Sequence, residues 1–184
     1  DTSVTGVQTC ALPIWGADLE DLLPLANDLK ETINFDCEVI SLRAPGIHPS
    51  GNGRQWYGLY PHDWDGAQDQ VNRLLLSIKK LDTYQIPLQK TILLGFSQGA
   101  AMAVDVGSKL DLGIIVACSG YPHPTLSTDE KYPPLIISHG LFDDVVPISA
   151  SRDIYDKVKS KSSQLCEIIE FEGFHQLDSN LIEI

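Results

Sequence analysis

Hydrophobic residues along the chain alternate between a helical spacing and short continuous runs. Amphipathic or alanine-rich stretches predict helices over 18–32, 63–81, 98–108 and 148–159, and another begins at 176. Continuous apolar runs predict buried strands over 37–42, 90–95, 112–118, 135–139 and 165–171. Residues 43–62 show no period and predict a long loop. Strands that alternate with helices are typical of an α/β fold, in which helices cover both faces of a mainly parallel sheet.

The first residues of the chain differ in origin from the rest, in our interpretation. Residues 4–14 match, in one reading frame, the translation of a common sequencing-adapter oligonucleotide. We therefore expect residues 1–14 to be a non-native leader and 15–184 to be one domain, incomplete at both ends and with its N-terminal strands missing. The alternative is a genuine but irregular strand within the leader. On our interpretation the sequence carries no information about a signal peptide.

Composition narrows the classes of function. The chain has 184 residues, of which 43% are hydrophobic, enough for one domain with a substantial core. It carries 25 acidic against 13 basic residues and no basic stripe, which argues against nucleic-acid binding. Its longest apolar runs are too short to span a membrane. Its four scattered cysteines lack a metal-binding spacing, so we expect no metal site and buried thiols in a reducing compartment, the cytoplasm.

The most specific motif joins the strand predicted at 90–95 to the helix predicted at 98–108. It reads Gly95-Phe96-Ser97-Gln98-Gly99, preceded by an apolar run and followed by helix formers. A strand, a tight turn and a helix in this order predict a nucleophile elbow, with Ser97 as the nucleophile.

The predicted nucleophile needs a base to take its proton and an acid to orient that base. In sheets with such an elbow, these partners follow in the chain order serine, acid, histidine. His48, His62 and His123 lie before the strand that leads to the acidic pair at 143–144, and His139 ends that strand, where it is better placed for local packing. His175 therefore remains as the base. Asp143 and Asp144 both follow a strand, and the residues alone do not choose between them as the acid.

Three motifs in this order resemble the phospholipase/carboxylesterase family of α/β-hydrolases, which includes acyl-protein thioesterases. They are the elbow, then His139-Gly140-x-x-Asp143, then Gly173-Phe174-His175. The resemblance covers the chain from residue 15 to its end. It implies a serine esterase without a cofactor, and its His-Gly-x-x-Asp motif favours Asp143 as the acid.

The same resemblance implies an oxyanion hole built from two backbone N–H groups. Family members carry His-Gly-x-Gly after a strand, and Trp15-Gly16 looks like the end of this motif, which makes Trp15 the x residue. The second N–H group would belong to Gln98, the residue after the nucleophile. The preceding His-Gly and its strand are absent. We therefore expect both neighbouring strands to have unpaired edges and this chain to be impaired as an enzyme.

Aromatic residues provide candidates for the substrate pocket. Trp56 and Tyr57 resemble the family segment that borders the acyl group, and the alternative is that both simply cover the core. The segment Tyr121-Pro122-His123-Pro124, after the strand predicted at 112–118, is a candidate for another wall. No lid insertion separates the elbow helix from Asp143, and an open site of this kind favours short acyl esters or exposed thioesters over triglycerides.

Together these observations predict a serine hydrolase that cleaves carboxylic esters of small or medium acyl chains through an acyl-enzyme intermediate. An acyl-protein thioesterase or a lysophospholipase is an alternative with the same chemistry. A catalytically impaired fragment, or a non-catalytic binding module on the hydrolase fold, is an alternative of another class. Dienelactone-hydrolase chemistry is disfavoured, because its elbow normally carries cysteine. We expect a small-molecule ester or thioester as the substrate, and a homodimer stays an open alternative.

Overall fold

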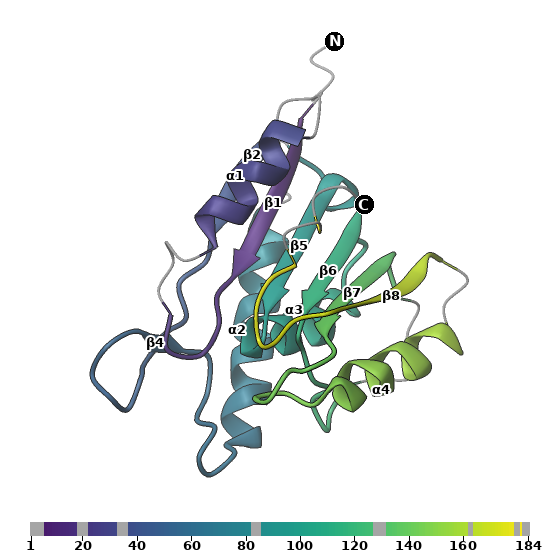
Figure 1. Cartoon of the computed structure of the whole chain (residues 1–184). Helices are drawn as coiled ribbons and strands as arrows, with labels where there is room; N and C mark the ends of the chain where they lie inside the picture. The colour runs from purple at the N-terminus through teal and green to yellow at the C-terminus, as the bar shows by residue number, and fades with distance from the viewer. Residues whose placement is uncertain are drawn as a thin grey trace.

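The described part of the chain forms a parallel sheet with helices on both faces (Figure 1). The computed structural model describes residues 6–17, 22–32, 37–81, 86–126, 132–161, 164–178 and 181. The strands of the sheet are β1 Val7–Leu12, β2 Cys37–Ser41, β5 Thr91–Phe96, β6 Ile114–Cys118, β7 Leu135–Gly140 and β8 Cys166–Phe171. They lie in the order β2-β1-β5-β6-β7-β8, and each neighbouring pair is parallel. The predicted α/β fold with a mainly parallel sheet is confirmed.

Helices cover the two faces of this sheet unequally. They are α1 Leu23–Thr32, α2 Trp64–Leu81, α3 Gln98–Gly107 and α4 Ile148–Lys159, with a 3₁₀ turn, η2, at Leu88–Lys90. Side chains alternate along β5, so Leu93 belongs to the larger core with α2, α3 and α4, whereas Leu94 belongs to a smaller core on the opposite face. The predicted apolar stripe of α2 is buried at Val71, Leu74 and Ile78. Figure 1 shows α1 in front of the sheet and α2 and α3 behind it.

The N-terminal segment contradicts the expectation that a strand is missing beside the elbow strand. Val7–Leu12 forms β1 and pairs with β2 along one edge and with β5 along the other. Its residues Thr9, Cys10 and Ala11 are completely buried. Small and β-branched side chains fit this position, because a central strand must pack beneath helices on both faces. The expectation of unpaired edges is therefore wrong, and the structural reason for an impaired enzyme disappears with it. The interpretation of residues 4–14 as adapter-derived stays a prediction.

Three further segments differ from their predicted form. β6 begins at Ile114 rather than at residue 112, because the Gly113 N–H group donates to carbonyls of the preceding η2 turn and of β5 instead of joining the ladder. The loop at 43–62 contains a small antiparallel pair, β3 Gly46–Ile47 and β4 Arg54–Gln55. The helix predicted from residue 176 is not formed at 176–178, and most of its remainder lies outside the described residues. The first residues of the helix predicted at 18–32, 18–21, also lie outside them.

Candidate active site

Ser97 lies on a sharp turn between β5 and α3. Its backbone has φ 54° and ψ −115°, a positive-φ conformation that residues other than glycine seldom adopt. The Ser97 N–H group donates to the carbonyl of Cys118 at 2.8 Å, which fixes the turn to β6. Gly95 allows the helix to start this close to the strand, since a Cβ atom there would lie 2.7 Å from the Ala100 nitrogen. The backbone therefore has the strained strand–turn–helix form that the motif predicts.

Gly99 places its backbone against the end of β1, and this close approach gives a testable prediction. A Cβ atom at Gly99 would lie 2.8 Å from the Pro13 carbonyl oxygen and closer still to that of Leu12. Gly99→Ala should therefore destabilise the protein by about 1–3 kcal/mol, which corresponds to a melting temperature about 2–12 °C lower. The control is Gly58→Ala, because a Cβ atom there meets only ordinary contacts, 3.6 Å to Asp63 Cβ. Equal melting temperatures of the two variants would contradict the close approach.

The loops after β7 and β8 bring Asp143 and His175 into contact. His175 Nδ1 lies 2.7 Å from Asp143 Oδ2, and the His175 ring stacks on Phe96 with the ring centroids 4.9 Å apart. When Nδ1–H donates to the carboxylate, Nε2 is the basic nitrogen. Nε2 is buried and forms no hydrogen bond with any described residue, so it does not bond to Ser97 Oγ either. Ser97 and His175 nevertheless line the same cavity, and catalytic hydrogen bonds are often long or poorly aligned before a substrate binds.

Asp143 is held in its ionised form. Its Oδ1 accepts hydrogen bonds from the backbone N–H groups of Val145 and Val146, at 2.9 and 2.8 Å. Burial alone would raise the pKa of the Asp143 carboxyl, but the hydrogen bonds from His175 and from these two N–H groups lower the pKa below its ordinary value. The side chain of Asp144 is exposed instead. Of the two adjacent carboxylates, the structure thus joins Asp143 to the imidazole.

His139 forms local hydrogen bonds, as its position at the end of a strand predicts. This completely buried side chain places Nδ1 2.7 Å from Ser151 Oγ and Nε2 2.9 Å from the Val146 carbonyl oxygen. Nε2 also lies 3.2 Å from Asp143 Oδ2. The ring therefore holds the loop that carries Asp143 against α4.

The two residues proposed for the oxyanion hole are both tied to the segment 55–57. Trp15 follows β1, lines the cavity, and donates from its indole Nε1 to Gln55 Oε1 at 2.7 Å. Gln98 is the first residue of α3, so its N–H group has no partner within the helix. The Gln98 side chain accepts from the Trp56 N–H group and donates to the Tyr57 carbonyl, both at 2.9 Å. These contacts hold both backbone segments beside the nucleophile.

A cavity of about 580 Å³ opens beside Ser97. Of the predicted wall segment 121–124, Tyr121 and Pro122 line this cavity, whereas His123 is buried and Pro124 does not line it. The structure does not bring Trp56 and Tyr57 into the lining, because both side chains are buried beneath it in the larger core. The aromatic walls come instead from Tyr60, His62 and Trp64, which the sequence analysis did not single out. Their signal was the density of aromatic residues around the end of the aperiodic loop.

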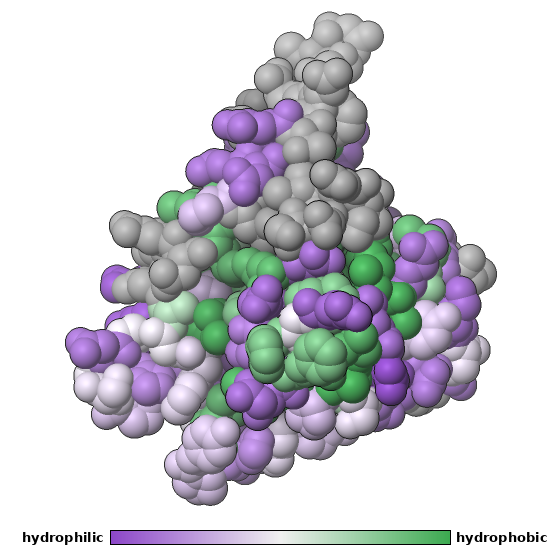
Figure 2. Space-filling model, in the orientation of Figure 1, coloured by the Kyte–Doolittle hydropathy of each residue, from purple (hydrophilic) through white to green (hydrophobic). Residues whose placement is uncertain are grey.

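Exposed hydrophobic side chains surround the carboxyl ends of β7 and β8. Phe142, Val145 and Phe174 are more than half exposed, at 55%, 62% and 60%, and the two phenylalanine rings lie 6.1 Å apart. Figure 2 shows hydrophobic side chains gathered on this face of the molecule, rimmed by polar ones. Because Val145 also lines the cavity, this surface continues the apolar wall outward.

A buried polar network, made of Asp105, His123, Tyr57 and Tyr121, lies behind the cavity. Tyr121 Oη is 2.6 Å from Tyr57 Oη, Tyr57 Oη is 2.7 Å from His123 Nε2, and His123 Nδ1 is 2.9 Å from Asp105 Oδ2. Lys109 contacts the other oxygen of Asp105. The side chains of Asp105, His123 and Tyr57 are at most 4% exposed. This network was not predicted from the sequence, although Asp105, the only charged residue of α3, was its signal.

The polar network predicts how stability changes with pH. Burial opposes ionisation of Asp105, but hydrogen bonds from His123 and Lys109 lower its pKa below the ordinary value of 3.8. Since the unfolded chain titrates near that ordinary value, the ionised carboxylate stabilises the fold above it, and this contribution is lost as the pH falls through the lower, folded-state pKa. Asp105→Asn should therefore melt well below the wild type at pH 7, and the gap should narrow as the pH falls below about 4. Circular dichroism measures both curves, with Asp144→Asn as the exposed control; a gap that does not change with pH would contradict the prediction.

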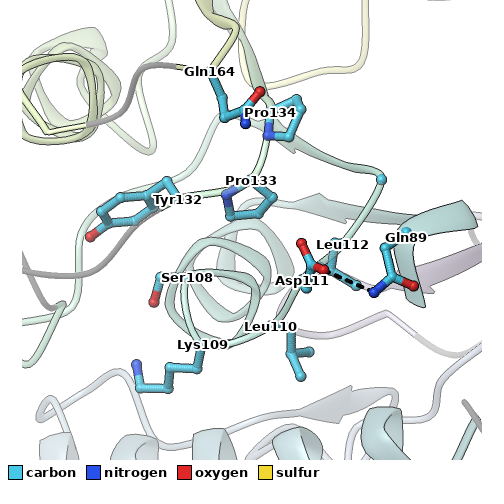
Figure 3. A pocket seen from close by; sticks show the side chains of 11 residues that line it. Gln89, Ser108, Lys109, Leu110, Asp111, Leu112, Tyr132, Pro133, Pro134 and Gln164 are labelled. Carbon is cyan, nitrogen blue, oxygen red and sulfur yellow. Dashed lines mark hydrogen bonds between the residues drawn. The ribbon is translucent and has the colours of Figure 1, made fainter. Parts of the chain in front are cut away.

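A second cavity, of about 670 Å³, lies at the opposite end of the strands (Figure 3). Gln89 and Pro134, which line it, come just before β5 and β7, so the cavity sits at the amino edge of the sheet. Figure 3 shows Gln89 donating to Asp111, a hydrogen bond of 2.8 Å. Active sites of parallel α/β sheets lie at the carboxyl edge. The cavity beside Ser97 is therefore the candidate active site.

The described residues contain no group of three or more side chains suited to hold a metal ion. Among the described helices, none has the length and hydrophobicity needed to cross a bilayer. All four cysteines are free and buried. Burial raises the pKa of the Cys10 and Cys118 thiols to about 12, so these thiols stay protonated at neutral pH.

Comparisons with known proteins agree with this geometry. The sequence profile of the family described as phospholipase/carboxylesterase matches residues 24–184. Acyl-protein thioesterase 1 of Saccharomyces cerevisiae is 30% identical over 148 residues, which cover 70% of this chain and 63% of the relative. Acyl-protein thioesterase 1 of Yarrowia lipolytica is 31% identical over 115 residues, which cover 54% of this chain and 49% of that protein. The chain thus spans about half to two thirds of the length of these relatives.

Solved structures support the same fold. Esterase PE8 superimposes with a TM-score of 0.84 at 25% sequence identity, covering 96% of this chain and 88% of its own. The carboxylesterase of Bacillus cereus superimposes with a TM-score of 0.80 at 17% identity, covering 100% of this chain and 86% of its own. At 17% identity, the similarity to the Bacillus cereus carboxylesterase concerns only the fold, which is the α/β-hydrolase fold.

Proposed function

Because the chain belongs to the phospholipase/carboxylesterase family, we propose that it hydrolyses carboxylic esters of small or medium acyl chains through an acyl-enzyme on Ser97. The observation that carries this proposal is the 2.7 Å contact between Asp143 Oδ2 and His175 Nδ1, because His175 and Ser97 line the same cavity. Asp143 accepts a hydrogen bond from the Nδ1–H group of His175, which leaves the unprotonated Nε2 of the imidazole to act as the base.

The reaction follows from these positions. His175 Nε2 takes the Ser97 hydroxyl proton as the oxygen attacks the acyl carbonyl, and the resulting oxyanion is stabilised by the N–H groups of Gln98 and Trp15. The same proton then passes to the leaving alcohol as the ester bond breaks. Water repeats the sequence on the acyl-enzyme and releases the carboxylic acid. No cofactor takes part in this scheme.

The first experiment tests whether Ser97 is the nucleophile. The protein should hydrolyse 4-nitrophenyl butyrate and take up a single fluorophosphonate label, detected by intact mass, whereas Ser97→Ala should do neither. Ser138→Ala is the matched control, because this serine is also buried and its Oγ has no hydrogen-bond partner within the described residues. A wild-type protein that is folded but neither labelled nor active would overturn the proposal and favour the non-catalytic binding module.

A thioesterase activity is the second candidate, and the names of the two yeast relatives favour it. The same acyl-enzyme chemistry serves oxygen esters and thioesters, since only the leaving group differs. Measuring kcat/KM on butyrate esters of an alcohol and of the matching thiol separates the two candidates. A preference for the thioester, retained on an acylated peptide, would assign acyl-protein thioesterase activity, and a preference for lysophosphatidylcholine would assign lysophospholipase activity.

We also propose a reducing compartment, the cytoplasm, as the site of action. The support is that all four cysteines are buried free thiols rather than disulfides.

A further inference from the structure

The carboxylate of Asp143 lies between two imidazole rings, and the proposed reaction uses only one of them. Its Oδ2 is 2.7 Å from Nδ1 of His175 and 3.2 Å from Nε2 of His139. His139 belongs to β7, is completely buried, and does not line the cavity beside Ser97. A substrate in that cavity does not touch this ring, so His139 can affect the reaction only through the residues that it contacts.

The contacts of His139 show that its Nε2 carries a hydrogen. Nε2 lies 2.9 Å from the Val146 carbonyl oxygen, which can only accept a hydrogen bond. Its other neighbour is the carboxylate of Asp143, whose lowered pKa keeps it ionised at neutral pH, so this group also only accepts. The Nε2–H group is therefore present whether the ring is neutral or charged. It donates to Val146, and its positive end lies beside Oδ2 of Asp143.

These contacts hold the turn that carries Asp143 from the inside. The N–H group of Val146 donates to Asp143 Oδ1 at 2.8 Å, while the carbonyl of the same residue accepts from His139. On the outer side of the turn, Phe142 and Val145 are more than half exposed, so packing there contributes little to its position. The bond from His139 is buried, and a buried carbonyl that loses its donor is costly.

Ser151 connects His139 to the next element. This serine of α4 is completely buried, and its Oγ lies 2.7 Å from Nδ1 of His139 and 3.2 Å from the Gly120 carbonyl oxygen. The ring is therefore fixed at both nitrogens, by α4 on one side and by the Asp143 turn on the other.

We propose that His139, held by Ser151, is a positioning residue that fixes the Asp143 carboxylate in the orientation in which it accepts the hydrogen bond from Nδ1–H of His175. The proposal rests on the esterase function proposed above. It adds to that reaction a residue that contacts neither the nucleophile nor the substrate cavity.

His139→Leu tests the proposal, because leucine keeps an apolar side chain in the core and removes both ring nitrogens. The kcat for 4-nitrophenyl butyrate should fall about 10- to 100-fold, since the acid is no longer held in place. KM should stay within about threefold, because His139 does not line the cavity. The matched control is Ser138→Ala, the neighbouring buried serine of β7, whose Oγ has no hydrogen-bond partner within the described residues; its kcat should change by less than about twofold.

His139→Gln should restore most of the activity. The glutamine side chain can place an N–H donor near the position of Nε2, so kcat should return to within about fivefold of the wild type. Melting temperatures show whether each variant is folded. Equal losses of kcat in folded His139→Leu and His139→Gln would overturn the proposal, because the donor would then have no role.

A double-mutant cycle separates the positioning of Asp143 from general damage to the site. If His139 acts through the carboxylate, His139→Leu should change kcat by less than about twofold in an Asp143→Ala background. Losses that multiply in the double variant would contradict a role exerted through Asp143.

Ser151→Ala repeats the cycle with a milder change. It leaves the ring in place and removes its partner on α4, so kcat should fall about three- to tenfold, and this loss should also disappear in the Asp143→Ala background. This variant decides the proposal if His139→Leu does not fold.

The outcomes separate this inference from the proposed function. Hydrolysis by the wild type, together with losses that multiply in the double variants, would overturn the role of His139 and leave the esterase function standing. A folded wild-type protein that hydrolyses no ester would overturn both.

Discussion

Asp143→Asn should lower kcat/KM for 4-nitrophenyl butyrate by about three to four orders of magnitude while leaving the fold intact. The reason lies in how the carboxylate is held. Its Oδ1 accepts two backbone N–H groups, so the oxygen of the new amide would stay at that position. The amide NH₂ group would then face His175 Nδ1 and force the ring proton onto Nε2. An imidazole in that tautomer cannot take the proton of Ser97.

Asp144→Asn is the matched control for this prediction. It removes a charge from the adjacent but exposed residue, so kcat/KM should change by less than about threefold, in line with the small effects of surface substitutions. Steady-state kinetics of both variants, together with their melting temperatures, give the comparison. Similar losses in the two variants, or a larger loss in Asp144→Asn, would mean that the orienting acid has been misassigned.

Thr9→Pro should destabilise the protein by at least about 3 kcal/mol, because proline removes a backbone N–H group from the middle of β1. Thr9 is completely buried, and β1 pairs on both sides, so water cannot replace the lost hydrogen bond. For a chain of this length the expected fall in melting temperature is about 6–12 °C or more. Thermal unfolding measured by circular dichroism tests it.

The control variant is Thr9→Val, which keeps the backbone N–H group and nearly the same shape. The Thr9 hydroxyl contacts only the Cys37 sulfur among the described residues, at 3.5 Å, so its loss should cost less than about 1 kcal/mol. If Thr9→Pro melts like Thr9→Val, residues 7–12 do not form a central strand in solution. That result would restore the interpretation of this segment as a leader outside the fold.

Local patterns were sufficient to predict most of the fold. α4 has the predicted ends, β5 is shifted by one residue, and β7 ends one residue later than predicted, because amphipathic spacing and apolar runs depend on neighbours in the sequence. The order of acid and base in such folds led to His175, and the resemblance to the His-Gly-x-x-Asp motif led to Asp143, and the structure places these two side chains in contact. Their role as partners of Ser97 stays a prediction. β1 was not predicted because residues 1–14 were interpreted as a non-native leader outside the domain. Its six residues nevertheless satisfy the requirements of a buried strand, and the origin of a segment does not affect how it pairs.

The cavity walls and the polar network could not be read from the sequence in this way. Tyr57, Asp105 and His123 come from a loop, from α3 and from the segment after β6, and only the tertiary fold places them within hydrogen-bond distance. Trp56 and Tyr57 show the same limit, because aromatic residues of an aperiodic loop fit a core as well as a pocket. Which of these two environments they occupy depends on how the loop folds back.

The close approach of Gly99 to the backbone of Leu12 and Pro13 has a consequence for protein engineering. The elbow recognises the main chain at the end of β1, not the identity of its side chains. Sequence libraries in β1 must therefore keep this main-chain path into Trp15, and they must also fit the completely buried positions of Cys10 and Ala11, where only side chains of similar volume are tolerated.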